Sequence, residues 1–313
     1  MRVRRHENEH MGINETERVP HVLGRDGVTP WIEVAQGARL NAHVLPRLMP
    51  PQQGSLLRPV PEDPLKNMAW WCYGLLEAAA DHLLFWADYA APLKFHPEAE
   101  TAHTLRPAFT LARAAIESSA QAIWVLSPED QVERVRRYIR LAIWDLDEQT
   151  KAAASQASRA ELEAHRDEIL KHLGITRRTM QTPKYLDIVR SAAEFLDGGD
   201  DVSPWTPTRV ERIWRSTAGA AHGKRWTDFE FHDRVDAGND LVYATPKADA
   251  ISEVLVLADR YLSAGVIVFA MRAGHWENFN NLWDEATADL KQRMGLSDLS
   301  VSTEVPHNRD RPA

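Results

Sequence analysis

The chain has 313 residues, of which 44% are hydrophobic and 26% are charged, as in an ordinary soluble globular protein. Its formal net charge of −8 argues against non-specific nucleic-acid binding over the whole surface, because such binding depends on neutralising phosphates. A local basic site remains compatible with that charge. The single cysteine, Cys72, excludes an internal disulfide bond.

The first sixty residues are predicted to form a flexible, proline-rich arm. Its end is crowded by Pro46, Pro50, Pro51, Pro59, Pro61 and Pro64, which leave little room for regular structure. Residues 31–45, WIEVAQGARLNAHVL, are expected to form a short element within it. The first twenty residues contain no apolar run and do not resemble a secretory signal, so we expect a cytoplasmic protein.

Residues 61–296 are predicted to form one helical domain. Several helix starts carry a capping residue followed by proline, which is accommodated at the first helical position. Helices are expected over residues 64–90, 97–126, 128–173 with a break at the capping box 158–161, 182–199, 206–223, 246–273 and 275–294.

Strand signals are scarce, and LVYATP at 241–246 is the one short strand expected. The apolar segment 251–274 is interrupted by Asp259 and Arg260, which favours a buried helix over a membrane span of about twenty apolar residues. The polar tail 297–313 is predicted to be disordered. The predicted fold class is all-α, an antiparallel helical bundle with appended C-terminal helices and no membrane association.

The stretch RIWRSTAGAAHGKRW, residues 212–226, carries the strongest functional pattern. Arg215 and His222 are seven residues apart on a predicted helix, so they differ by only about 20° around its axis. Gly223 suits the position after the helix end. Histidine exchanges protons near neutral pH and arginine clamps phosphate, which together favour metal-independent phosphodiester cleavage. Lys224 and Arg225 would hold the RNA backbone.

The pattern of an arginine, six intervening residues and a histidine within an all-α bundle resembles the HEPN superfamily. In that superfamily the residue after the arginine is often polar, and in this chain it is Ser216. Asn, Asp or His is more usual there. The resemblance implies a metal-independent endoribonuclease of toxin–antitoxin or phage-defence systems, with His222 and Arg215 as catalytic residues and Ser216 as support. It also implies single-stranded RNA as substrate, a homodimer in which two motifs meet, and a protein inhibitor.

A second polar pattern lies on the predicted helix 97–126, where Arg106, Arg113 and Glu117 share one face. Arg113-x3-Glu117 followed by RSTAGAAHG resembles uncharacterised bacterial helical proteins related to that superfamily, over residues 64–274. One interpretation is an internal Arg113–Glu117 ion pair that braces a neighbouring helix. The other is that this stripe faces Arg215 and His222, so that Glu117 orients one of them.

Two other hypotheses remain open. The chain could be a non-catalytic helical scaffold whose Arg–Glu and Arg–His pairs are buried braces and whose tryptophan-rich faces bind a partner or a second copy. It could also bind a metal or small ligand on the helical stripe Glu161, His165, Glu168 and His172, although a solvated face fits that stripe better. No cofactor and no metal are expected for the favoured hypothesis.

Overall fold

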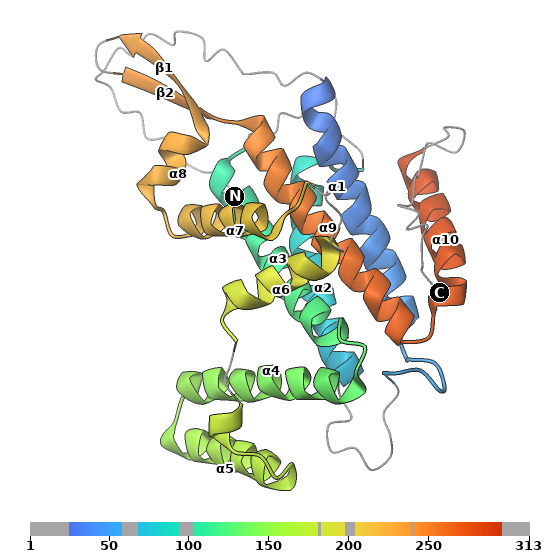
Figure 1. Cartoon of the computed structure of the whole chain (residues 1–313). Coiled ribbons are helices and arrows are strands. Elements are labelled where there is room, and N and C mark those ends of the chain that lie inside the picture. Colours follow the sequence, from blue (N-terminus) through green and yellow to red (C-terminus); the bar gives the residue numbers. More distant parts are fainter. Residues whose placement is uncertain are drawn as a thin grey trace, which may run out of the picture.

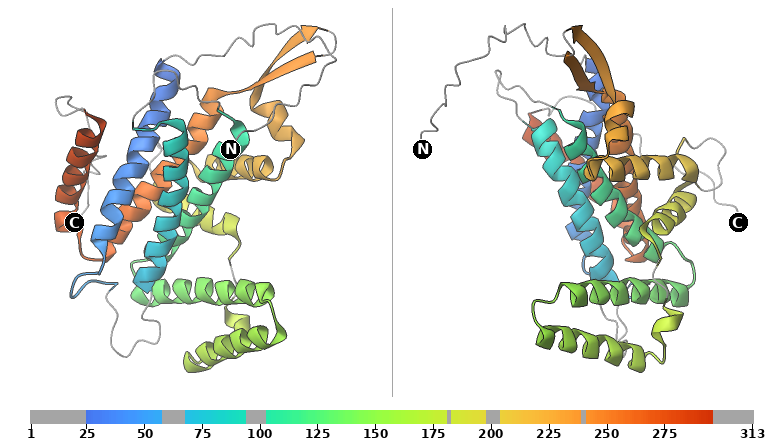
Figure 2. Two further views of the ribbon diagram at one scale, coloured as in Figure 1. Left: turned by 180° about the vertical axis from the view of Figure 1, so that it is seen from behind. Right: turned by 90° about the vertical axis from the view of Figure 1, so that its left-hand side faces the viewer.

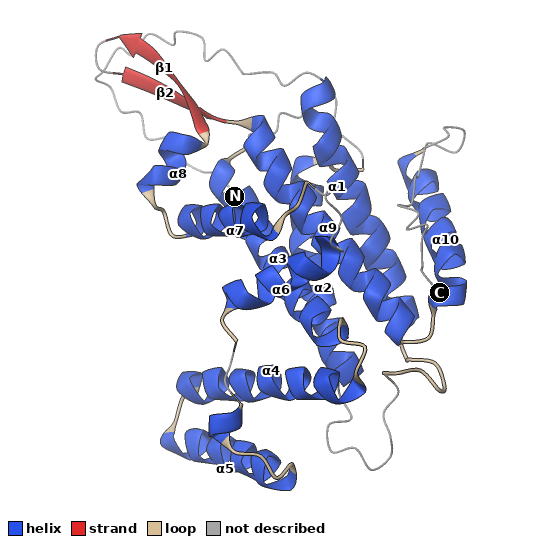
Figure 3. Ribbon diagram, in the orientation of Figure 1, coloured by secondary structure: helices blue, strands red, loops and turns tan. Residues whose placement is uncertain are grey.

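The structure of the protein, a computed structural model, describes residues 25–57, 68–93, 103–180, 183–197, 204–238 and 241–295. Most of these residues are helical (Figure 3). Two short strands, β1 (His232–Gly238) and β2 (Leu241–Pro246), pair as an antiparallel hairpin. The prediction of an all-α fold is confirmed. The strand expected at 241–246 is β2, and its partner β1 was not predicted.

Four helices form the central bundle: α1 (Arg25–Val44), α2 (Met68–Ala90), α3 (Leu105–Leu126) and α9 (Ala248–Arg272). In Figure 1, α1, α3 and α9 run in the same direction and α2 runs against them. The hydrogen bonds from Trp31 to Ser252 and from Asn41 to Ser263 show the parallel register of α1 and α9. The antiparallel contacts of the bundle are therefore those that α2 makes.

The remaining helices are added outside this bundle. Helices α6 (Tyr185–Asp197) and α7 (Pro207–Ala221) pack on α3, the short α8 (Arg225–Glu230) follows α7, and α10 (Trp276–Met294) packs on α1. Helices α4 (Gln131–Ala152) and α5 (Gln156–His172) form a hairpin at one end of the bundle (Figure 1). The break expected near 158–161 therefore falls a few residues earlier. The 3₁₀ turns are η1 (Leu45–Leu48) and η2 (Arg177–Thr179).

The predicted flexible arm is wrong for residues 25–57, and the short element expected at residues 31–45 is part of a longer helix, α1. Helix α1 is a full member of the bundle, and its side chains at Trp31, Val34, Ala38 and Val44 are buried in the core. Trp31, Val34 and Ala38 follow one another at intervals of three and four residues and so face one side of a helix, a signal that outweighs the prolines that follow. Residues 1–24, 58–60 and the predicted tail 297–313 lie outside the described residues.

Helix α9 is the one helix of the described residues that is long and apolar enough to cross a membrane. However, 61% of its most apolar stretch is buried inside the protein. Ala258, Leu262 and Phe269 are completely enclosed by the neighbouring helices. The burial is that of a core helix, as the sequence predicted for residues 251–274.

A polar seam runs between α1 and α9. Asn41 donates from Nδ2 to the Gly37 carbonyl and to Ser263 Oγ, both at 2.9 Å. Gly37 lies so close to Asp259 that a Cβ atom would be 2.4 Å from Asp259 Oδ1. That oxygen is shielded from solvent and has no hydrogen-bond partner within the described part of the chain. Glycine at position 37 therefore permits the close approach of the two helices.

Alanine at position 37 should weaken this contact. We expect Gly37→Ala to lower the free energy of unfolding by roughly 1–2 kcal/mol, because overpacking outweighs the gain in helix propensity. Gly74→Ala on α2 is the matched control, since a Cβ there meets no heavy atom within 4 Å, and it should stabilise by about 0.5–1 kcal/mol. Urea denaturation measures both, and equal effects of the two variants would contradict this packing.

The Asp259 carboxyl should make stability depend on pH. Burial raises its pKa to about 7, and the nearby Glu33 carboxylate adds to the shift. Between about pH 4 and pH 7 the unfolded chain loses this proton while the folded chain keeps it, so stability falls as pH rises through that window.

Asp259→Asn removes this titration. We expect it to raise the free energy of unfolding modestly at pH 5 and by at most roughly 4 kcal/mol above pH 7.5. Urea unfolding across this pH range tests it, and a gain that does not change with pH would contradict the assignment.

Candidate functional site

The Arg–His motif occupies the last two turns of α7. Thr206 caps the start of this helix by accepting a hydrogen bond from the Arg209 amide, and Pro207 takes the first position. The helix ends at Ala221, His222 is the capping residue, and Gly223 follows with a φ of 66°. The predicted placement of Gly223 just past the helix end is confirmed. Arg215 and His222 are both exposed.

An open groove of about 480 Å³ lies where α8 packs against α7. Gly219 makes this packing possible, since a Cβ there would lie 2.7 Å from the Trp226 ring. Across the groove, Arg212 of α7 pairs with Glu230 of α8 at 2.6 Å. The groove is lined by Thr208, Glu211, Arg212, Arg215, Ser216, Trp226 and Glu230.

Arg215 is held at the groove by a carboxylate but keeps much of its guanidinium in solvent. Its Nε donates to Glu211 Oε1 at 2.8 Å, while its side chain remains 58% exposed. Glu211 also pairs with Arg190 of α6. The hydrogen bonds from Arg215 and Arg190 lower the pKa of Glu211. The arginine is thus oriented through Nε, which leaves its two terminal nitrogens for a ligand.

His222 lies beyond the groove, at the end of the same ridge. Two helical turns separate it from Arg215, which is about 10 Å along the axis. Within the described part of the chain, the side chains of His222 and Lys224 have no hydrogen-bond or ion-pair partner. Arg225 lies over the Phe229 ring, with 5.8 Å from its Cζ to the ring centroid. This end of the ridge is cationic and accessible.

Ser216 forms part of the groove wall but is buried. Its hydroxyl donates to the Arg212 carbonyl at 2.9 Å, one turn earlier in α7. The hydroxyl proton is therefore engaged by the helix itself. In this arrangement Ser216 supports the backbone of α7 beneath Arg215.

The polar stripe of α3 meets α7 at Trp214, the neighbour of Arg215. Glu117 Oε1 accepts hydrogen bonds from Arg113 Nε at 2.9 Å and from Trp214 Nε1 at 2.8 Å. The Arg113 guanidinium also lies over the Trp214 ring, 5.3 Å from its centroid. These contacts fit the brace interpretation: Glu117 holds Trp214, and no described hydrogen bond or ion pair joins it to Arg215 or His222.

Arg106 braces a different element of the same region. Its Nη2 atom pairs with Asp228 of α8 at 2.7 Å. The contact ties the start of α3 to α8, and α8 carries Trp226 into the groove. Arg106 therefore supports the groove from outside it.

Sequence reasoning missed Arg212, Trp226 and Glu230. Trp226 and Glu230 lie beyond the turn that follows α7, so no helical spacing joins them to Arg215. Arg212 precedes Arg215 by three residues on the same helix, a spacing that places the two side chains next to each other and could have been used. A further signal was Gly219, a glycine inside a helix pattern that often marks close packing. It predicts that another element approaches α7 at that turn.

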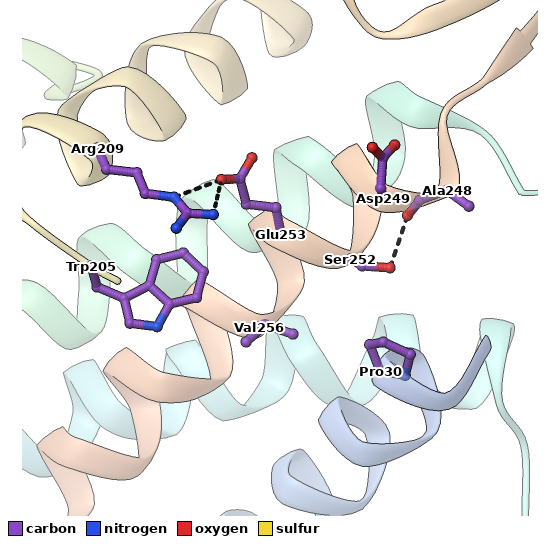
Figure 4. Close-up of a pocket in the computed structure, with 8 residues that line it drawn as sticks. All are labelled: Pro30, Trp205, Arg209, Ala248, Asp249, Ser252, Glu253 and Val256. Atoms are coloured by element: carbon purple, nitrogen blue, oxygen red, sulfur yellow. Dashed lines mark hydrogen bonds and ion pairs between the residues drawn. The ribbon is translucent and has the colours of Figure 1, made fainter. Parts of the chain in front are cut away.

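A second open hollow, of about 520 Å³, lies between α1, α9 and the start of α7 (Figure 4). The Arg209 guanidinium lies over the Trp205 ring and pairs with Glu253 at 2.7 Å. Ser252 donates to the Ala248 carbonyl and accepts from Trp31. Because these polar groups bond to one another, this hollow is a weaker candidate than the groove beside Arg215.

The helical stripe considered for metal binding is solvated. Glu161, His165, Glu168 and His172 are all exposed on α5. Across the described ranges, no three His, Cys, Asp or Glu residues are grouped so as to hold a metal ion.

Comparison with known proteins found no family model, no curated protein and no solved structure that matches this chain. The resemblance to HEPN proteins therefore rests on the residues of this chain alone.

The brace between α3 and α7 can be tested with one substitution. Trp214→Phe keeps an aromatic side chain but replaces the indole by the smaller phenyl ring and removes the N–H donor, so Glu117 loses a partner, and we expect the free energy of unfolding to fall by about 1–2 kcal/mol. Trp276→Phe is the control, because Trp276 is exposed and should change stability by less than about 0.5 kcal/mol. Urea denaturation distinguishes them, and equal losses would argue against the brace.

Proposed function

We propose that the chain is an HEPN-like, metal-independent endoribonuclease that cleaves single-stranded RNA along the ridge of α7 and α8. The observation that carries the proposal is that Arg215 and His222 are exposed on one ridge, beside an open groove that contains a second arginine and a tryptophan. A pair buried beneath α9 would have favoured the scaffold hypothesis instead.

RNA binding would use the aromatic and cationic side chains of α8 and the preceding turn. Trp226 is 43% exposed, which suits the stacking of an unpaired base. Phe229 is 57% exposed, but Arg225 and Arg234 lie over its ring, so a base would compete with them. Lys224 and Arg225 would neutralise phosphates of the same strand. Because the basic surface is local, it is compatible with the net acidic charge of the chain.

The proposed reaction is attack of the ribose 2′-hydroxyl on the adjacent phosphorus. His222 accepts the hydroxyl proton, the new O–P bond forms, and the bond to the 5′-oxygen breaks, with that oxygen taking a proton from water or from the imidazolium. The terminal nitrogens of Arg215 hold the phosphorane oxygens.

The resemblance adds partners to this proposal. A homodimer would bring two α7 ridges together, and a protein inhibitor would cover the ridge in a toxin–antitoxin system. Phage defence is the alternative setting, and a cytoplasmic location fits both. No metal or cofactor takes part in the proposed step.

The non-catalytic scaffold is the second candidate, and the contacts of the α3 stripe favour it. Arg113, Glu117 and Trp214 bond to one another, and Glu211 links Arg215 to Arg190. In a scaffold these pairs would only hold α3, α6 and α7 together. Such a protein would bind partners without cleaving RNA.

Cleavage of labelled single-stranded RNA by the purified protein tests the proposal. We expect His222→Ala and Arg215→Ala each to reduce the rate at least about a hundredfold, because each removes a group that acts in the transition state. EDTA should not change the rate, and DNA of the same sequence should resist cleavage because it lacks the 2′-hydroxyl.

Two variants serve as matched controls. Arg293→Ala removes an arginine that is 56% exposed and paired four residues back with Asp289, much as Arg215 is paired with Glu211. His172→Ala removes an exposed histidine from the last turn of α5. Both should cleave RNA like the wild type. Absence of cleavage, or an equal rate from all variants, would reject the nuclease and leave the scaffold.

A further inference from the structure

The outer face of α2 carries a stripe of exposed side chains on the side of α3 away from α7. Helices α1 and α3 flank α2, and in the left view of Figure 2 α2 lies in front of them. At 100° per residue the exposed members of this stripe fall within roughly 80° around the helix axis. They are Trp70, Glu77, Asp81, Phe85 and Asp88.

Two aromatic side chains dominate the apolar part of this stripe. Phe85 is 71% exposed and Trp70 is 60% exposed, and Tyr89 at the edge of the stripe is also exposed. Trp70 contacts Tyr73 edge to face, with ring centroids 5.7 Å apart. Trp70 and Phe85 are about 22 Å apart along the helix axis, so each forms its own exposed aromatic point on this face. Exposed aromatic side chains of this size favour an interaction site.

The charged part of the stripe is acidic. Helix α2 contains Glu77, Asp81 and Asp88 and no lysine or arginine. Asp88 pairs at 2.9 Å with Arg39, whose side chain is only 8% exposed and so presents no cation at the surface. Tyr73 donates its hydroxyl proton to Glu77 at 3.0 Å. Glu77 and Asp81 are thus left facing solvent between the two exposed aromatic groups.

The middle of the stripe is also open to close approach. Gly74 lies between Trp70 and Asp81 along the helix, and a Cβ atom there would meet no heavy atom within 4 Å. The surface directly over Gly74 is therefore open at the scale of a methyl group. The stripe therefore combines aromatic ends, acidic flanks and a gap at its centre.

We propose that this outer face of α2, defined by Trp70, Glu77, Asp81 and Phe85, docks a cationic amphipathic helix of a partner protein. Lysine or arginine side chains of that helix would pair with Glu77 and Asp81, and its apolar side chains would cover Trp70 and Phe85. Cations would also be attracted to the aromatic faces. The inference does not depend on the nuclease, because α2 and α7 contact different sides of α3.

The acidic charge of the stripe argues against a second copy of this chain as its occupant. A two-fold contact between copies of this chain places the same surface on both sides, so Glu77 and Asp81 would face the same acidic stripe. Like charges facing one another across an interface disfavour it. A partner of opposite charge removes this penalty.

A labelled peptide tests the proposal with the full-length protein. The probe is a fluorescein-labelled amphipathic helical peptide with lysines on one face and leucines on the other, followed by fluorescence anisotropy. We expect saturable binding that weakens at least about tenfold in Glu77→Gln/Asp81→Asn and in Phe85→Ser. The same peptide with glutamate in place of lysine should not bind.

Controls separate this face from acidic surface in general. Glu161→Gln/Glu168→Gln removes two exposed carboxylates from α5, whose described residues include no exposed aromatic side chain, and should bind the peptide like the wild type. Absence of binding, or equal binding by all variants, overturns the proposal.

The oligomeric state, measured by light scattering, tests the alternative. If the wild type is a dimer and Phe85→Ser converts it to a monomer, the proposal is overturned and the face is assigned to a second copy. RNA cleavage should be unchanged in the α2 variants, so failure of one proposal is distinguishable from failure of the other.

Discussion

The carboxyl end of α3 is the point on which the rest of the structure depends. Helix α3 contacts α2, α4, α6, α7 and α9, so its last carbonyl groups end among other helices and need donors. Two arginines supply them: Arg137 donates to the carbonyl of Trp124 at 2.8 Å, and Arg272 to that of Leu126 at 3.1 Å. A third, Arg134, donates to the carbonyls of Pro128 and Glu129 in the turn that follows α3, at 2.7 and 2.8 Å.

These arginines belong to two different helices, α4 and α9, and so they fasten both helices to the end of α3. Arg272 is the last residue of α9 and joins the bundle helices where they end together, while Arg134 and Arg137 attach the α4–α5 hairpin. Cations are favoured at the negative end of the helix dipole. The Arg134 side chain is fully buried, and burial together with the neighbouring Arg272 lowers its pKa. The carbonyl groups of the turn compensate for that cost.

Helix α3 also separates two surfaces of opposite character. On one side α7 and α8 expose His222, Lys224 and Arg225 beside aromatic rings, and on the other α2 exposes carboxylates beside Trp70 and Phe85. Figure 2 shows α2 and α7 on different sides of the bundle. The net charge of −8 is therefore a poor guide to either surface, because salt screens the interaction between exposed charges beyond about 8 Å under physiological conditions.

The amino-acid sequence by itself determined the helices from α2 to α7, α9 and α10, the burial of the apolar α9, the end of α7 just before Gly223, and the placement of Arg215 and His222 along one side of α7. Each of these follows from periodicity or capping within a single helix, which acts over a few residues. Only the tertiary structure decided that α1 joins the core, that Glu117 turns to Trp214, and that α8 packs over Gly219 to bring Trp226 beside Arg215. Those outcomes depend on which helices pack together and how closely. The spacing of residues along one helix does not show which other helix will pack against it.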